Sequence, residues 1–237
     1  MVFKLYRGIA IAPQDLPRLE KELAEEGLRW SKSSSWSTQV CDLRGRLAEL
    51  TADPTLSTQA TRRTEKQREF LCACGDWDGA AYYATRHNVT KDHTSSLILS
   101  FEAPASEVIV DGKDLLYTLF QAGPSPARRK AVASAYGTRA IEYLERAWQS
   151  EDQNYRIAMC DVACQDAAVV RAHYRNRLVL AGRHETRFRS AFCVLTPFPT
   201  AVVKIETLDR SVELPAVQIN LRDLFLHGGD PPHGGVR

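Results

Sequence analysis

The order of strand-like and helix-like segments constrains this chain more than any other feature of its sequence. Residues 3–11 alternate as a strand does, and residues 95–102 and 107–110 are rich in β-forming side chains. Residues from about 114 to 148 have helical spacing, and after Gly182 the pattern is β-type again. Strand, helices, strands, helices and strands in this order predict an α+β fold. We expect an antiparallel-leaning sheet with a helical insertion.

Shorter segments complete this prediction. Residues 14–27 have leucines on one face and Gly27 as a stop, which predicts an amphipathic helix. In the first strand, Gly8 permits a close approach by another backbone. Further helices are expected at residues 41–50, 65–74 and 80–85.

The second half of the chain contains one ambiguous stretch, residues 155–181. Val169-Val170 is typical of a strand, whereas the alanine-rich spacing around it favours a helix. Late strands are expected at residues 190–195, 201–206, 212–214 and 217–221. We therefore predict a single α+β domain over residues 1–226, with the helical insertion at about 114–181. The tail, residues 227–237, lacks packing side chains and is expected to be disordered.

Composition excludes several classes of protein. The 237 residues include 44% hydrophobic and 25% charged residues, which is ordinary globular usage. No apolar run approaches the roughly 18 residues of a membrane-spanning helix, and the N-terminus has no signal-peptide pattern. We therefore expect a cytoplasmic protein without membrane contact. A net charge of +2 is too small to indicate a nucleic-acid partner by itself.

The six cysteines do not form a recognised metal motif. Cys72 and Cys74 are separated by one residue, which is closer than in the usual zinc or redox pair. Together with His87 and His93 they have the donor types for zinc. The simpler interpretation, which we favour, is that the cysteines are small core residues kept reduced in the cytoplasm.

Motifs of dinucleotide-binding folds, phosphate-binding loops, nucleophile elbows and kinases do not occur in the sequence. A looser series of features does. Tyr6-Arg7-Gly8 lies toward the end of the first strand, and residues 79–84 bring Tyr82-Tyr83-Ala84. An apolar strand ending in Pro104 follows. This order resembles the ADP-ribosyltransferase superfamily, which implies a split β-sheet core and NAD as a substrate.

The resemblance implies a role for each of these residues. Arg7 would bond the pyrophosphate or ribose of NAD through its planar fork. Tyr82 or Tyr83 would stack on the cationic nicotinamide, and Tyr83 matches the family's aromatic residue before alanine. Ser35, in a serine-rich run, would contact the ribose. Each of these side chains also has an ordinary structural interpretation, as a strand charge, a core aromatic or a loop serine.

In the same family a late carboxylate stabilises the ribose as nicotinamide leaves. Glu213 matches it best because a short apolar strand follows, and Glu206 is the alternative. Glu69 also resembles a family acid but precedes the tyrosines. Ser211 stands where arginine-modifying members have a second glutamate, so the acceptor is expected to be another protein group or a nucleic acid. An NAD-hydrolysing toxin and a non-enzymatic binding module remain alternatives.

One stretch of the chain is locally basic. Between residues 171 and 189 there are six arginines and Glu185 as the one acid. Such a stretch is compatible with nucleic-acid contact, with Arg171, Arg175, Arg177 and Arg187 as candidate residues. A solvated helix face is the alternative interpretation.

Overall fold

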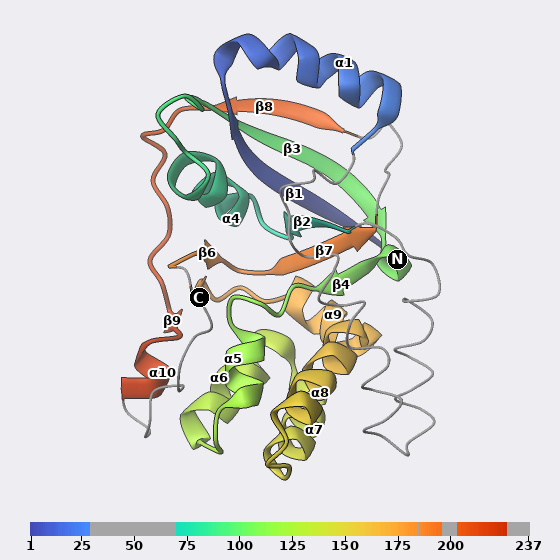
Figure 1. The fold of residues 1–237 in the computed structure, drawn as a ribbon, viewed down its shortest axis with the longest axis vertical. Helices are drawn as coiled ribbons and strands as arrows, with labels where there is room; N and C mark the ends of the chain where they lie inside the picture. Colours follow the sequence, from blue (N-terminus) through green and yellow to red (C-terminus); the bar gives the residue numbers. More distant parts are fainter. Residues whose placement is uncertain (29–69, 184, 196–202, 227–237) are drawn as a thin grey trace.

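The computed structural model describes residues 1–28, 70–183, 185–195 and 203–226 (Figure 1). It has an α+β fold, as the sequence predicted, with six strands in one sheet in the order β4-β7-β2-β1-β3-β8. Every strand pairing in this sheet is antiparallel. The strands are β1 (Val2–Ile11), β2 (Phe70–Cys74), β3 (Ser95–Pro104), β4 (Val108–Val110), β7 (Ala191–Leu195) and β8 (Lys204–Leu208).

A second sheet has three short strands in the order β6-β5-β9. They are β5 (Leu180–Ala181), β6 (Arg187–Phe188) and β9 (Ile219–Asn220). β5 pairs antiparallel with β6 and parallel with β9. Residues 212–217, where the sequence suggested further strand, have no regular structure, so the strand predicted at 212–214 is wrong.

The large sheet consists of two halves. β1 pairs with β3 along its whole length, from Val2 opposite Pro104 to Ile11 opposite Ser95. Between β1 and β2, the described pairing is the single residue pair Tyr6 and Cys74. The half β8-β3-β1 is therefore joined to the half β2-β7-β4 at one point, which we call the junction.

β2 corrects the helix expected at residues 65–74. Residues 70–74 form a strand that pairs with β7 from Phe70 opposite Leu195 to Cys74 opposite Ala191, and residues 65–69 lie outside the described part of the chain. A short apolar run has no period that separates strand from helix. Hydrogen bonds to a strand more than a hundred residues later decide the outcome here.

The predicted N-terminal helix is confirmed. A short 3₁₀ turn, η1 (Pro13–Asp15), leads into α1 (Leu16–Glu26), which buries Leu23 and ends at Gly27 with a φ of 74°. The helix predicted at residues 41–50 lies outside the described residues.

The middle of the chain is helical, as expected. In Figure 1 its helices gather below β4, on the opposite side of the sheet region from α1. The ambiguous stretch is helical up to Tyr174, and none of the described helices is long and apolar enough to cross a bilayer. These helices are α5 (Leu116–Gln121), α6 (Pro126–Tyr136), α7 (Thr138–Trp148), α8 (Gln153–Gln165) and α9 (Ala167–Tyr174); outside them lie η3 (Ala105–Glu107) and α10 (Asp223–Leu226).

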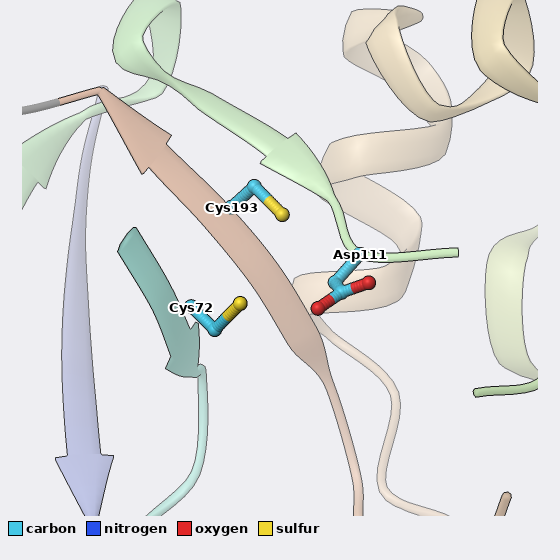
Figure 2. A group of neighbouring side chains, drawn as sticks. All are labelled: Cys72, Asp111 and Cys193. Carbon is cyan, nitrogen blue, oxygen red and sulfur yellow. The ribbon is translucent and has the colours of Figure 1, made fainter. Parts of the chain in front are cut away.

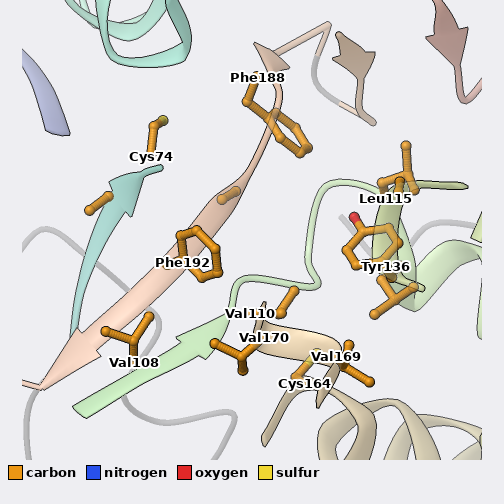
Figure 3. Close-up of a cluster of buried hydrophobic side chains, with 14 of the residues drawn as sticks. Cys74, Val108, Val110, Leu115, Tyr136, Cys164, Val169, Val170, Phe188 and Phe192 are labelled. Atoms are coloured by element: carbon orange, nitrogen blue, oxygen red, sulfur yellow. The ribbon is translucent and has the colours of Figure 1, made fainter. Parts of the chain in front are cut away.

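Buried aromatic rings attach these helices to the sheet (Figure 3). Phe192 of β7 lies against Phe3 of β1, with ring centroids 6.2 Å apart, and Phe3 stacks on Tyr174 of α9 at 4.2 Å. His173 stacks on Tyr136 of α6 at 4.3 Å. Figure 3 shows Phe192, Val108 and Val110 facing Tyr136, Val169 and Val170. Stacked and edge-on rings of this kind add to the stabilisation that burial gives.

His173 also links the two layers through hydrogen bonds. Its Nδ1 lies 2.9 Å from the carbonyl oxygen of Ala135, and its Nε2 accepts the N–H of Ala191 at 2.9 Å. The ring must therefore be neutral, with its proton on Nδ1. Complete burial lowers the pKa of His173 to about 4, and the bond to Ala135 opposes this shift.

The pH dependence of stability follows from His173. The unfolded chain takes up a proton near pH 6.5 and the folded chain only near pH 4, so the free energy of unfolding falls as the pH drops through this window. We expect a loss of about 3 kcal/mol across the window. Urea unfolding of the wild type and of His173→Gln at several pH values measures it.

Burial raises the pKa of Asp161 to about 7, so this group makes the free energy of unfolding rise as the pH falls. Because the wild type and His173→Gln both contain Asp161, its contribution cancels when their pH slopes are compared. An equal pH slope in the two proteins would show that His173 is not held neutral.

The helix α4 (Trp77–Tyr82) continues into η2 (Tyr83–His87), a turn of π-helix. This segment lies directly against β1 at Gly8, where an added Cβ would be 1.8 Å from the carbonyl oxygen of Ala80 and 2.8 Å from the nitrogen of Ala84. The close backbone approach predicted for Gly8 is therefore confirmed. Only a residue without a side chain fits at this position.

We predict that Gly8→Ala destabilises the protein strongly, because both clashing groups are backbone and cannot rotate away. The expected loss is about 3 kcal/mol or more, at or above the upper end of ordinary overpacking. Gly123→Ala is the matched control, since its Cβ would meet no atom within 4 Å, and it should change stability by less than about 0.5 kcal/mol. Chemical denaturation measures both, and similar values would contradict the contact.

Candidate functional site

The candidate residues of the described chain lie on or around α4–η2. Its N-cap residue, Asp76, accepts the N–H of Gly79 at 2.7 Å through one carboxylate oxygen. The other oxygen accepts the N–H groups of Arg189 and Ser190 at 3.0 Å each. One carboxylate therefore fastens the start of α4 to the chain entering β7. Burial raises the pKa of Asp76, and these three bonds oppose the shift.

Arg7 does not lie at a strand end, as the sequence suggested, because β1 continues to Ile11 along its pairing with β3. Its partly buried side chain donates from Nη1 to the carbonyl oxygen of Cys72 at 2.7 Å. Burial lowers the pKa of the guanidinium, and the nearby Cys72 and Cys74 oppose this shift.

The bond from Arg7 to the carbonyl of Cys72 lies where β1 and β2 stop pairing and separate. From the pair Tyr6–Cys74, a continuing antiparallel register would place Arg7 opposite Ala73 and then Gly8 opposite Cys72. Instead, the carbonyl of Cys72 accepts from Arg7, and the carbonyl of Gly8 accepts from Nδ2 of Asn88 at 3.0 Å. The side chains of Arg7 and Asn88 thus replace backbone hydrogen bonds at the point where the pairing of β1 and β2 stops. Buried backbone carbonyls in folded proteins almost always have a hydrogen-bond partner.

Tyr82 and Tyr83 have different surroundings. The Tyr83 hydroxyl donates to the Asp114 carboxylate at 3.1 Å, and Thr186 donates to the same oxygen at 2.8 Å. Burial, and then the charge of Asp114, raise the pKa of Tyr83 well above its ordinary value. The Tyr82 hydroxyl donates to the carbonyl of Glu185 at 2.8 Å. Asp114 was missed in the sequence because no local pattern links it to the tyrosines.

A hollow of about 200 Å³, its open mouth included, lies beside α4. Tyr82 lines it together with Leu214 and Pro215, the residues that follow Glu213. Arg86 of η2 holds that segment in place, because it donates to the carbonyls of Arg210 at 2.6 Å and Val212 at 3.3 Å. Tyr82 and the chain around Glu213 therefore meet at one opening.

The two candidate acids are both exposed. Glu213 lies in the irregular segment next to the hollow, and the structure gives no bond from its carboxylate to Arg7. Glu206 is on the edge strand β8 and accepts from Nε1 of Trp77 at 3.3 Å. Ser35 and Glu69 lie outside the described residues.

Comparisons with protein-family models, with curated proteins and with solved structures found no match. The interpretation of the site therefore rests on its own residues. Among these, the arginines expected to contact nucleic acid are exposed, while Arg189 pairs with Asp78 at 2.9 Å. The exposed ones are Arg171, Arg175, Arg177, Arg183 and Arg187.

A second group of polar side chains lies on the half-sheet beyond the junction (Figure 2). Donor atoms of Cys72, Asp111 and Cys193 all lie within 4.8 Å of one another. His87 and His93, considered above with Cys72, are exposed and not part of this group. Burial, and then the neighbouring Asp114, raise the pKa of Asp111 to about 6.

We predict that Asp76→Ala lowers the free energy of unfolding by about 2–4 kcal/mol. Loss of an N-cap costs about 0.5–2 kcal/mol, and each buried N–H left without a partner adds to this. Asp78→Ala removes a carboxylate two residues away whose described ion pair with Arg189 is partly exposed, and should cost less than about 1 kcal/mol. Equal losses in denaturation would mean that the three backbone bonds of Asp76 contribute little.

Proposed function

We propose that this protein cleaves the bond between nicotinamide and ribose in NAD and transfers ADP-ribose to a macromolecule. The observation that carries the proposal is the junction, where a guanidinium occupies the opening of the sheet next to the tyrosine-bearing helix. A sheet joined by one residue pair supports an ADP-ribosyltransferase-like split core. The series Arg7, Tyr82-Tyr83 and a late glutamate agrees with the resemblance seen in the sequence.

Arg7 is the proposed ligand of the NAD phosphates or ribose. A guanidinium has five N–H donors in a rigid fork, and the bond to Cys72 fixes its orientation. Its low exposure strengthens any charge-assisted bond to a phosphate because water screens it less. Lysine cannot reproduce this planar arrangement.

Tyr82 is the better candidate for stacking on nicotinamide. Both hydroxyls are hydrogen-bonded, Tyr82 to the carbonyl of Glu185 and Tyr83 to Asp114, but Tyr82 is the one of the two that lines the hollow. We therefore assign the aromatic contact to Tyr82 and a positioning role to Tyr83, although the sequence pattern favoured Tyr83. The enclosed part of the hollow is only about 10 Å³, far below the roughly 300–1,000 Å³ of complete ligand pockets, so an NAD site needs space that the described hollow does not supply.

Glu213 is the proposed acid. Nicotinamide leaves with the bonding electrons of its C1′–N bond, so positive charge develops on the ribose, and a carboxylate stabilises it. The acceptor then bonds to C1′ and releases its proton. The position of Glu213 beside the hollow favours it over Glu206, which is bonded to Trp77.

The acceptor we propose is a nucleic acid or another protein. Five exposed arginines between Arg171 and Arg187 favour a polyanion. The same surface supports the second candidate function, a nucleic-acid-binding module without catalysis, in which Arg7 and the tyrosines are structural. Release of nicotinamide distinguishes the two candidates.

The test measures nicotinamide release by purified protein and transfer of labelled ADP-ribose to RNA, DNA and lysate protein. Glu213→Gln should reduce release by about 10²-fold with NAD binding retained, the scale for one transition-state partner. Arg7→Lys should reduce it at least about tenfold, a loss of about 1.4 kcal/mol in transition-state binding. Arg18→Ala, on the exposed face of α1, is the control and should behave as the wild type.

Melting temperatures must accompany these assays, because Arg7 also bonds the backbone of β2. Tyr82→Ala provides a variant outside the junction that should also reduce release. If the wild type releases no nicotinamide but binds RNA or DNA in a salt-dependent manner, the binding module is correct. If Glu206→Gln is inactive and Glu213→Gln active, the acid lies on β8.

A further inference from the structure

Three adjacent strands of the half-sheet β2-β7-β4 bring three metal-binding side chains to one place. Figure 2 shows the thiols of Cys72 and Cys193 and the carboxylate of Asp111 pointing toward one another. Their donor atoms all lie within 4.8 Å of one another. Within the described chain this is the one group of three or more such residues.

The pairing of the strands explains this convergence. Cys72 on β2 is directly opposite Cys193 on β7, and Cys193 is directly opposite Ile109 on β4. Side chains two residues apart on a strand point to the same face, so Asp111 follows Ile109 on the cysteine side. The N–H of Asp111 bonds to the carbonyl of Ala191 at 2.9 Å, which continues the strand geometry as far as this residue. The backbone therefore fixes all three positions.

The donor types select among metals. Two thiolates and one carboxylate suit zinc, a borderline-soft ion, and do not suit calcium or magnesium, which take oxygen ligands. Tetrahedral zinc places thiolate and carboxylate donors about 3.5–3.8 Å apart, given bonds of about 2.3 and 2.0–2.2 Å. Small side-chain rotations bring donors from within 4.8 Å to this spacing.

The charges nearby are also consistent with a cation. Two thiolates and one carboxylate carry three negative charges, which a divalent ion reduces to one. The guanidinium of Arg7, bonded to the carbonyl of Cys72, supplies the remaining positive charge. Cys193 is 5% exposed, whereas Cys72 and Asp111 are partly exposed, so an ion can reach the group from one side.

We propose that Cys72, Asp111 and Cys193 bind one zinc ion, with the fourth position taken by water or another small ligand. Binding releases the two thiol protons to solvent and leaves the oxidation states unchanged. The ion ties β2, β7 and β4 together beside the junction. This inference is independent of NAD cleavage, because metal binding is measured without NAD.

The experiment uses the full chain, purified with a reductant and stripped with a chelator. Titration with Zn²⁺ against a chromophoric competitor, and with Co²⁺ for its thiolate charge-transfer absorption, should give one site per chain. Zn²⁺ should also raise the melting temperature, since a ligand of the folded state stabilises it. Cys72→Ser and Asp111→Asn should each weaken zinc binding by more than the roughly 10–100-fold that outer-shell changes cause.

Cys160→Ser is the matched control, because Cys160 is a buried cysteine of α8 outside the group, and it should retain one equivalent. Cys193→Ser tests the buried ligand. If this variant does not fold, zinc binding by Cys72→Ser and Asp111→Asn tests the proposal. The proposal is overturned if the reduced wild type binds no Zn²⁺ at micromolar concentrations. Equal loss of zinc in Cys160→Ser, or a Co²⁺ spectrum without thiolate bands, would also overturn it.

Discussion

The arrangement of this molecule depends on the place where the ladder between β1 and β2 stops. After Tyr6 and Cys74 the two strands separate, and the carbonyls of Gly8 and Cys72 accept bonds from Asn88 and Arg7. A buried carbonyl without a partner would cost about 1–3 kcal/mol, so the opening requires side chains that replace the lost bonds. The position of a charged, half-buried residue in the middle of β1 is thereby explained.

The segment α4–η2 follows from the same constraint. It begins where β2 ends, and Asp76 fastens its start to the chain entering β7. It then crosses β1 at Gly8, where backbone touches backbone. Both halves of the sheet are thus held by one short segment, which also carries the two tyrosines. A change at Gly8 therefore acts on the candidate site through the backbone of α4–η2, whereas a change at Asp76 also alters the lining of the hollow beside Tyr82.

The sequence predicted those helices and strands whose structure is decided by a local pattern of residues. The leucine spacing of α1, the run of β3 and the helices between residues 116 and 148 were expected, and so was the role of Gly8, whereas the stretch that holds α8 and α9 had been ambiguous. β2 was not, because its five residues have neither period nor cap, and only pairing with β1 and β7 makes them a strand. The opposite error occurred around Glu213, where an apolar run predicted a strand at residues 212–214. In the structure these residues do not pair with a neighbouring strand.

The residues of the candidate site show the same difference between those that a local pattern identifies and those that only the fold brings together. Arg7 and the tyrosines could be chosen because each belongs to a short contiguous motif. Asp111, Asp114 and Cys193 could not, since their proximity to the motif residues arises from strand order and not from spacing in the chain. Alternation does place Ile109 and Asp111 on one face, but nothing local shows that β7 lies between β4 and β2. The opening of the sheet accounts for Arg7 and Asn88, whose side chains bond the carbonyls freed from the ladder, and the guanidinium of Arg7 has more N–H donors than this one bond uses.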